Sequence, residues 1–123
     1  MEYVVFDSSF LIAVVEKPAT WYEDIQEKLG KFNPVMLDGV SGELDDLVKR
    51  GGKRGRFAAL AKELGESFMK VRGEKGGPPD DEILSWAASN DAFVATLDAR
   101  MLDHLRASRM RYVTLRRGRV FIY

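Results

Sequence analysis

Four carboxylate side chains lie at or near the ends of short apolar runs in this sequence. They are Asp7, Glu43, Asp80 and Asp98. In an α/β fold with a parallel sheet, the carboxyl ends of the strands open on one crevice, which is where such folds place ligands. We therefore expect these scattered acids to converge in space. Clustered oxygen ligands suit Mg²⁺ or Mn²⁺, and such ions assist the hydrolysis of phosphodiester bonds.

Asp7 is the strongest single candidate among the four acids. It lies between the apolar runs 3–6 and 10–15, where an ionised carboxylate is costly unless it finds a metal, a cation or backbone donors. A helix N-cap is the alternative interpretation, but Ser8 or Ser9 could supply that cap. We therefore place Asp7 in the site.

Helical geometry selects Asp80 among three consecutive acids. At about 100° per residue, the apolar positions of a helix over residues 80–90 form a stripe centred close to Asp80. Asp81 lies at the edge of that stripe and takes a supporting role, whereas Glu82 points away. The alternative is that both aspartates only interact favourably with the helix dipole.

The same geometry favours Glu43 in a helix over residues 43–50. Leu47 lies one turn from Glu43 on the same face, and the two neighbouring acids, Asp45 and Asp46, fall on the outer side. An acid in any first helical turn also interacts with the dipole, so this alternative stays open for Glu43. Asp98 precedes a predicted helix, and capping is an equally serious alternative there.

Other catalytic chemistries find little support in the sequence. The chain has no cysteine and a single histidine, His104, which we expect on the outer side of the last helix as an ordinary surface residue. One histidine argues against a zinc site and against a nucleophilic triad. The glycine-rich signatures of nucleotide-binding loops are absent as well.

Composition indicates one globular domain over residues 1–123. The chain is 46% hydrophobic and 31% charged, which is ordinary for a folded protein. The absence of cysteine is compatible with a reducing cytosol. No signal-peptide pattern and no apolar run of membrane-spanning length is present, so we expect a cytoplasmic protein without membrane association.

The formal net charge of zero conceals a segregation of charge along the chain. Blocks 1–48 and 76–99 are net acidic, whereas blocks 49–75 and 100–123 are net basic. An acidic centre flanked by basic segments suits a polyanion such as RNA, although the basic side chains could also simply solvate helix faces. The candidate RNA contacts lie in a glycine-rich stretch and are Lys49, Arg50, Lys53, Arg54 and Arg56.

Strand and helix patterns alternate along the sequence. Apolar runs predict strands over 3–6, 35–37, 92–96 and 112–115, with an edge strand over 120–123. Helices are predicted over 10–15, 20–30, 43–50, 57–68, 80–90 and 99–107, the third of them capped by Ser41 after a turn at 38–39. We interpret 49–56 as a mobile loop and 72–79 as a second glycine-rich loop. The alternation indicates a three-layer α/β/α sandwich with a central, mostly parallel sheet.

The chain resembles PIN-domain ribonucleases over nearly its whole length. The matching segments are Val4-Val5-Phe6-Asp7-Ser8-Ser9-Phe10-Leu11-Ile12, Ser41-Gly42-Glu43-Leu44, Asp80-Asp81-Glu82-Ile83-Leu84-Ser85-Trp86-Ala87 and Val94-Ala95-Thr96-Leu97-Asp98. The paired aspartates and the ending 112–118 look most like the archaeal branch close to PIN nucleases of ribosomal RNA processing. VapC toxins of toxin-antitoxin pairs share the same core.

This resemblance implies a Rossmann-like fold and an Mg²⁺- or Mn²⁺-dependent endoribonuclease activity. It implies that Asp7, Glu43, Asp80 and Asp98 form the catalytic quartet, with Asp7, Asp80 and Asp98 as metal ligands. By the same resemblance, Asp81, Ser9 and Thr96 are supporting residues. A homodimer is expected, and the partner is either an antitoxin or a ribosome-assembly factor.

Two other functional classes remain open. The chain could be a non-catalytic RNA-binding or ribosome-assembly module that retains the acidic pocket. It could also be an acid-pocket phosphatase or receiver-like domain, although Asp7-Ser8-Ser9 lacks the second aspartate of a haloacid-dehalogenase-type nucleophile motif.

Overall fold

The sequence folds into a six-stranded sheet with helices on both faces. The computed structural model describes residues 1–18, 20–73 and 77–123. The strands are β1 (Glu2–Phe6), β2 (Phe32–Leu37), β3 (Met69–Val71), β4 (Phe93–Ala95), β5 (Tyr112–Arg116) and β6 (Arg119–Ile122). The helices are α1 (Ser8–Glu16), α2 (Trp21–Leu29), α3 (Asp38–Arg50), α4 (Gly52–Leu64), α5 (Pro79–Asn90) and α6 (Ala99–Ala107), with a 3₁₀ turn at Gly65–Ser67.

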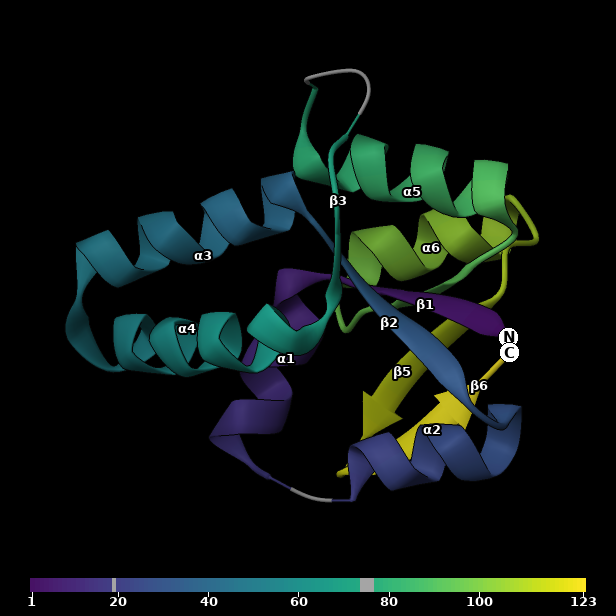
Figure 1. The fold of residues 1–123 in the computed structure, drawn as a ribbon, viewed down its shortest axis with the longest axis horizontal. Coiled ribbons are helices and arrows are strands. Elements are labelled where there is room, and N and C mark those ends of the chain that lie inside the picture. The colour runs from purple at the N-terminus through teal and green to yellow at the C-terminus, as the bar shows by residue number, and fades with distance from the viewer. Residues whose placement is uncertain (19, 74–76) are drawn as a thin grey trace.

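The sheet has the strand order β3-β2-β1-β4-β5-β6, and only β6 runs antiparallel to its neighbour. From β1 the chain moves outward to β2 and β3, then returns to pair β4 with the other side of β1. Right-handed crossovers therefore put α1 to α4 on one face of the sheet and α5 and α6 on the other, as Figure 1 shows. The predicted mostly parallel α/β/α sandwich is confirmed.

The core is densest around the central strand β1. Val4, Val5 and Phe6 are fully buried, because helices cover both faces of this strand. The Phe6 ring contacts the rings of Phe10 and Trp21 at centroid distances of 5.4 and 5.7 Å. This packing fixes the position of the chain just before Asp7.

Helices α3 and α4 form a hairpin where we predicted a loop. The stretch 49–56 is not a loop, since α3 continues to Arg50 and α4 begins at Gly52. Two glycines make so tight a connection feasible, because Gly51 and Gly52 adopt φ of +74° and +72°, a region open to residues without a Cβ. The hairpin extends away from the sheet in Figure 1.

Two further local predictions were wrong. Helix α3 starts at Asp38 directly after β2, so residues 38–39 are not a turn and Ser41 is not a cap. Strand β3 was missed, because a three-residue edge strand that is mostly exposed carries no apolar run. The predicted glycine-rich loop 72–79 falls partly on 74–76, outside the described residues.

No helix in the described part of the chain is long and apolar enough to cross a membrane.

Candidate active site

Asp7 lies at the point where the strand order of the sheet reverses. It follows β1, and its backbone N–H donates to the carbonyl oxygen of Ala95 at the end of β4, 2.9 Å away. Because β1 and β4 are neighbours whose connections leave in opposite directions, a crevice opens at their carboxyl ends. Asp7 therefore occupies the place where open α/β sheets bind ligands.

Three donors hold the buried Asp7 carboxylate. Its Oδ2 atom accepts from the hydroxyls of Thr96 and Ser9, at 2.7 and 2.9 Å. Its Oδ1 atom accepts from the backbone N–H of Ser8 at 2.8 Å. Asp7 is thus itself the N-cap residue of α1, as the alternative interpretation held, and our expectation that Ser8 or Ser9 would supply that cap was wrong.

Ser9 and Thr96 join this network to the segment after β4. Their hydroxyl oxygens are 3.2 Å apart. The backbone N–H of Leu97 donates to Ser9, and that of Asp98 donates to Thr96, at 3.0 and 3.1 Å. Thr96 is completely buried. The network fixes the Asp7 carboxylate in one orientation and ties it to the start of α6.

Glu43 reaches the same crevice from α3. It is half-buried, and the Ser8 hydroxyl donates to its Oε1 atom at 3.4 Å. Burial raises the pKa of Glu43 from 4.5 to about 7, and the charges of Asp7 and Asp80 act in the same direction. Glu43 is therefore within electrostatic range of acids from two other elements. Its inward position agrees with the prediction, while Asp45 pairs with Lys62 of α4.

Asp80 enters the crevice from the first turn of α5. Partial burial raises its pKa, and the charges of Asp7, Asp98 and Asp81 raise it further. The predicted buried stripe was misplaced, since Asp80 and Asp81 are both exposed and Glu82 is buried. Glu82 lies beneath Gly73, where a Cβ atom would come within 1.8 Å of its Oε2 atom. Asp80 thus lies at the solvent-exposed edge of the crevice, within electrostatic range of Asp7 and Asp98, and Asp81 is its exposed neighbour.

Asp98 caps helix α6, which is the alternative we left open for it. Its Oδ1 atom accepts from the backbone N–H of Met101 at 3.0 Å. It also contributes to the raised pKa values of both Glu43 and Asp80, so it lies near them. A cap uses one oxygen of the carboxylate, and the second oxygen has no protein donor within the described residues. The cap and a ligand role are therefore compatible.

The charges of Asp7 and Asp98 act on both Glu43 and Asp80, but the described residues form no metal centre. Within residues 1–18, 20–73 and 77–123, no group of three acidic or imidazole side chains is close enough to hold an ion as shared direct ligands. None of the four acids forms an ion pair with a lysine or arginine of these residues. Carboxylates that repel one another and form no ion pair are suitable oxygen ligands for a hard divalent cation. The residues present therefore fit Mg²⁺ or Mn²⁺.

Two basic residues beside Asp80 were not predicted as part of the site. Arg100 and His104 of α6 line a pocket together with Asp80 and Asp81 of α5. His104 is exposed, as expected, but it faces this pocket. Their spacing of four residues in a helix that follows Asp98 is the sequence signal that could have identified them.

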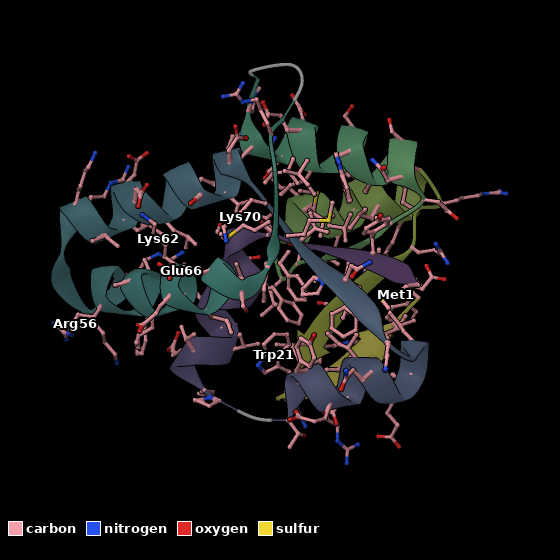
Figure 2. All side chains as sticks on the ribbon, viewed as in Figure 1. Met1, Trp21, Arg56, Lys62, Glu66 and Lys70 are labelled. Carbon is pink, nitrogen blue, oxygen red and sulfur yellow. The ribbon has the colours of Figure 1, made fainter. Side chains whose placement is uncertain are left out.

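The predicted RNA contacts lie at the far end of the α3–α4 hairpin. All five of these side chains are exposed. Figure 2 shows Arg56 at the tip of the hairpin, well away from the sheet. Glu43 and Arg50 are seven positions apart, which corresponds to about 10 Å along the helix. The basic tip and the acidic crevice are thus separate surfaces that the same helix connects.

The fold is an α/β/α domain with acidic residues at the switch point of its sheet. Residues 4–119 match the family model of the PIN-like domain, and the chain belongs to that family. The family resemblance drawn from the sequence is therefore confirmed. No curated protein matches the sequence.

Solved structures share the fold at low sequence identity. The PIN domain endonuclease Utp24 is 22% identical with a TM-score of 0.80, and the match covers 98% of this chain and 90% of that one. A domain of a functionally unknown protein from Methanocaldococcus jannaschii is 16% identical with a TM-score of 0.68, covering 97% and 94%. VapBC2 from Rickettsia felis, bound to a DNA fragment from its promoter, is 13% identical with a TM-score of 0.68, covering 91% and 98%.

Proposed function

We propose that this chain is a single-domain, Mg²⁺- or Mn²⁺-dependent endoribonuclease. The observation that carries the proposal is the set of four carboxylates from four separate segments at the switch point of the sheet, where burial and the charges of Asp7 and Asp98 raise the pKa values of Glu43 and Asp80. Membership of a nuclease family supports the reaction class. The basic segments on either side of the acidic blocks support RNA as the polyanion.

Each acid has a distinct task in this proposal. Asp7, Asp80 and Asp98 hold the cation, which supplies Lewis-acid polarisation of the phosphate and activation of water. Mg²⁺ retains several of its waters and needs only one or two direct carboxylates, which agrees with acids that lie near one another without sharing a tight centre. Ser9 and Thr96 orient Asp7 through the hydroxyl hydrogen bonds at its Oδ2 atom.

Glu43 has a separate role because its pKa of about 7 lies near the working pH. A carboxyl group with such a pKa can both accept and release a proton at its Oε atoms. Ser8 keeps Oε1 in place by donating to it. Glu43 therefore handles the proton that leaves the attacking water, while Asp81 adds negative charge beside Asp80.

Cleavage of labelled RNA by purified protein tests this function. We expect cleavage with Mg²⁺ or Mn²⁺ and none with EDTA. Asp7→Asn should lower the rate by more than about 100-fold, since residues that merely orient metal ligands already account for about 10 to 100-fold. Asp46→Asn, which changes an exposed acid of α3 outside the crevice, should cleave at the wild-type rate. Persistence of cleavage in the Asp7→Asn protein would contradict the proposal.

A non-catalytic RNA-binding or ribosome-assembly module is the second candidate. The five exposed basic residues at the tip of the α3–α4 hairpin, away from the acidic crevice, favour it. RNA binding by the wild-type protein without metal-dependent cleavage of any substrate would establish this alternative.

The biological setting follows from the same proposal. We infer a cytoplasmic homodimer that acts either as a toxin with an antitoxin partner or as a ribosomal RNA-processing nuclease with a ribosome-assembly partner. VapBC proteins from Rickettsia felis and nontypeable Haemophilus influenzae, and the endonuclease Utp24, share its fold. The gene neighbourhood separates the two settings, since a small reading frame for an antitoxin immediately upstream supports the toxin.

A further inference from the structure

The two edges of the sheet differ in how they are protected against pairing with another chain. Strand β3 forms one edge and strand β6 forms the other. Proteins block an exposed edge with charged side chains, above all lysine, placed along the strand. Lys70 occupies the centre of β3, whereas no charged residue lies between Val120 and Tyr123 at the edge of β6. The β6 edge therefore lacks the protection that the β3 edge has.

The backbone of β6 directs hydrogen-bonding groups outward at two residues. Tyr112 and Tyr123 exchange both of their backbone hydrogen bonds, at 3.2 and 2.9 Å. Because hydrogen-bonded pairs alternate along an antiparallel ladder, the N–H and C=O groups of Val120 and Ile122 point away from β5. No loop or cap backbone group among the described residues bonds to them. Strand β6 therefore offers these groups to a further strand.

Helix α2 packs beside β6 but leaves its edge open. A pocket of about 550 Å³ lies between Asp24, Glu27 and Lys28 of α2 and residues 119–121 of β6. Neighbouring residues of a strand face opposite sides of the sheet, so these three residues of β6 belong to both faces. A pocket that both faces line reaches around the free edge. The edge is therefore accessible to an added strand.

The sequence of this edge is complementary to itself. When two copies pair antiparallel with Phe121 opposite Phe121, Val120 faces Ile122 of the other copy and Arg119 faces its Tyr123. This register sets the outward-pointing backbone groups of the two copies opposite each other, as hydrogen-bonded pairs require. Aromatic pairs and aliphatic pairs stabilise neighbouring strands. A guanidinium is attracted to the face of a tyrosine ring, so all five facing pairs are favourable.

The contact between arginine and aromatic rings has a precedent within the same hairpin. The guanidinium carbon of Arg116 lies 4.6 Å from the centre of the Phe121 ring, and Arg116 also donates to the Tyr123 hydroxyl. Tyr123 is 52% exposed, so its ring is accessible to a second arginine. Arg119 is exposed and forms no ion pair with the described residues. It is therefore available for the Tyr123 ring of a second copy.

We propose that two copies of this chain pair through β6 and form one continuous sheet. This inference rests on the homodimer of the proposed function and adds the surface that forms it. The contact is isologous, because a two-fold axis passes beside Phe121. Antiparallel pairing of the edges points the parallel strands of the two copies in opposite directions. Their acidic crevices therefore open at opposite ends of the shared sheet, and each copy cleaves RNA with its own acids.

Single cysteine variants test the register, because the chain has no cysteine of its own. In a non-hydrogen-bonded antiparallel pair the Cα atoms are about 4.5 Å apart, which a disulfide can bridge. Phe121→Cys should therefore form a cross-linked dimer on mild oxidation, seen on a non-reducing gel. Arg119→Cys should not, since an offset of four residues places the two Cα atoms about 14 Å apart. Met69→Cys, an exposed position on the other edge, is the second control.

Charge substitutions at the two-fold axis test the dimer without oxidation. In analytical ultracentrifugation the wild type should sediment at twice the mass of one chain. Phe121→Lys and Phe121→Glu each place like charges directly opposite each other, so each variant alone should sediment as a single chain. An equal mixture of the two should restore the double mass, because lysine then faces glutamate. Met69→Lys should leave the wild-type mass unchanged, and circular dichroism shows that each variant is folded.

Two results would overturn the inference. One is a wild-type protein that sediments as a single chain at the concentration used for cross-linking. The other is a Phe121→Cys protein that cross-links no more than Met69→Cys does. If the lysine and glutamate variants do not fold, the cysteine comparison decides alone.

The interface and the nuclease fail in different ways. Cleavage per chain should be the same in Phe121→Lys and in the wild type, because each crevice is complete within one copy. A wild-type monomer that cleaves RNA with Mg²⁺ or Mn²⁺ refutes the interface and leaves the nuclease standing. A dimer that Phe121→Lys separates, but that shows no metal-dependent cleavage, supports the interface and refutes the nuclease.

Discussion

The two sides of the acidic crevice are built in opposite ways. On the β1–β4 side, the buried Asp7 carboxylate receives three hydrogen bonds from Ser8, Ser9 and Thr96. On the α3–α5 side, Glu43 receives one long hydrogen bond, and the pKa values of Glu43 and Asp80 are both raised. On the first side, hydrogen-bond donors of the protein stabilise the carboxylate. On the second side, the carboxylates have few such donors and are repelled by neighbouring negative charges.

This difference indicates how the site divides its work. Hydrogen bonds from fixed donors stabilise a buried carboxylate and also hold it in place. Carboxylates without such donors destabilise the fold wherever they are ionised, and a cation relieves that repulsion. The β1–β4 side therefore holds the Asp7 carboxylate in a fixed position. The α3–α5 side lowers the stability of the fold in the absence of a cation and gains stability when a cation binds. Substitutions on the two sides should change stability in opposite directions.

Thr96→Val should cause the largest change in stability. The substitution keeps the shape of the fully buried side chain and removes the hydroxyl that donates to Asp7. It also removes the acceptor for the backbone N–H of Asp98. Because each of these groups stays buried or half-buried without its partner, the free energy of unfolding should fall by about 2 kcal/mol. Urea unfolding monitored by circular dichroism measures this loss.

Thr114→Val is the matched control for that measurement. Thr114 is a buried threonine of β5 outside the crevice, so its replacement removes a hydroxyl without touching an acid. Equal losses of unfolding free energy in the two valine variants would mean that the hydrogen bonds to Asp7 contribute no more than any buried threonine hydroxyl. The proposed difference between the two sides of the crevice would then be wrong.

Glu43→Gln should have a smaller effect of the opposite sign. The pKa of Glu43 rises from 4.5 in the unfolded chain to about 7 in the folded protein. Between these pH values the folded protein binds the proton more tightly, so stability falls as pH rises through the window. Above pH 7 the glutamine variant should therefore be more stable than wild type in EDTA, by on the order of 1 kcal/mol after allowance for solvent screening.

Thermal unfolding at a series of pH values checks this expectation. The difference between Glu43→Gln and wild type should shrink as pH falls and vanish below pH 4.5, where the Glu43 carboxyl group is protonated in both the folded and the unfolded state. Asp46→Asn, an exposed acid of the same helix, should show no such dependence. If the glutamine variant were less stable than wild type at pH 8, the ionised Glu43 carboxylate would have favourable partners in the folded protein, which contradicts this expectation.

The sequence was most informative where local chemistry alone determines the structure. Helix α6 begins at Ala99 and ends at Ala107 as predicted, because Asp98 caps it and apolar residues repeat at helical spacing. Asp7 was found because a carboxylate between two apolar runs is conspicuous. The family resemblance supplied Ser9 and Thr96, whose hydroxyls no periodicity would have selected.

Prediction failed where tertiary packing overrides the local pattern. The basic, glycine-rich stretch 49–56 reads as a loop, yet helix α4 packs along α3 and makes it helical. Glu82 was placed outward from helical geometry, but the loop at Gly73 covers it. The pocket between α5 and α6 depends on two helices that no local pattern brings together, so the spacing of Arg100 and His104 could mark one face of α6 but could not connect that face with Asp80.

Stabilisation of the protein by Mn²⁺ tests most directly the claim that the crevice takes up a cation whose charge relieves the repulsion on the α3–α5 side. At pH 7.5, Mn²⁺ at about 100 times its Kd should raise the free energy of unfolding of the wild type by about 2.7 kcal/mol. The double variant Glu43→Gln with Asp80→Asn should gain little, while Asp46→Asn should gain as much as wild type. An equal gain in the double variant, or none in the wild type, would contradict the account.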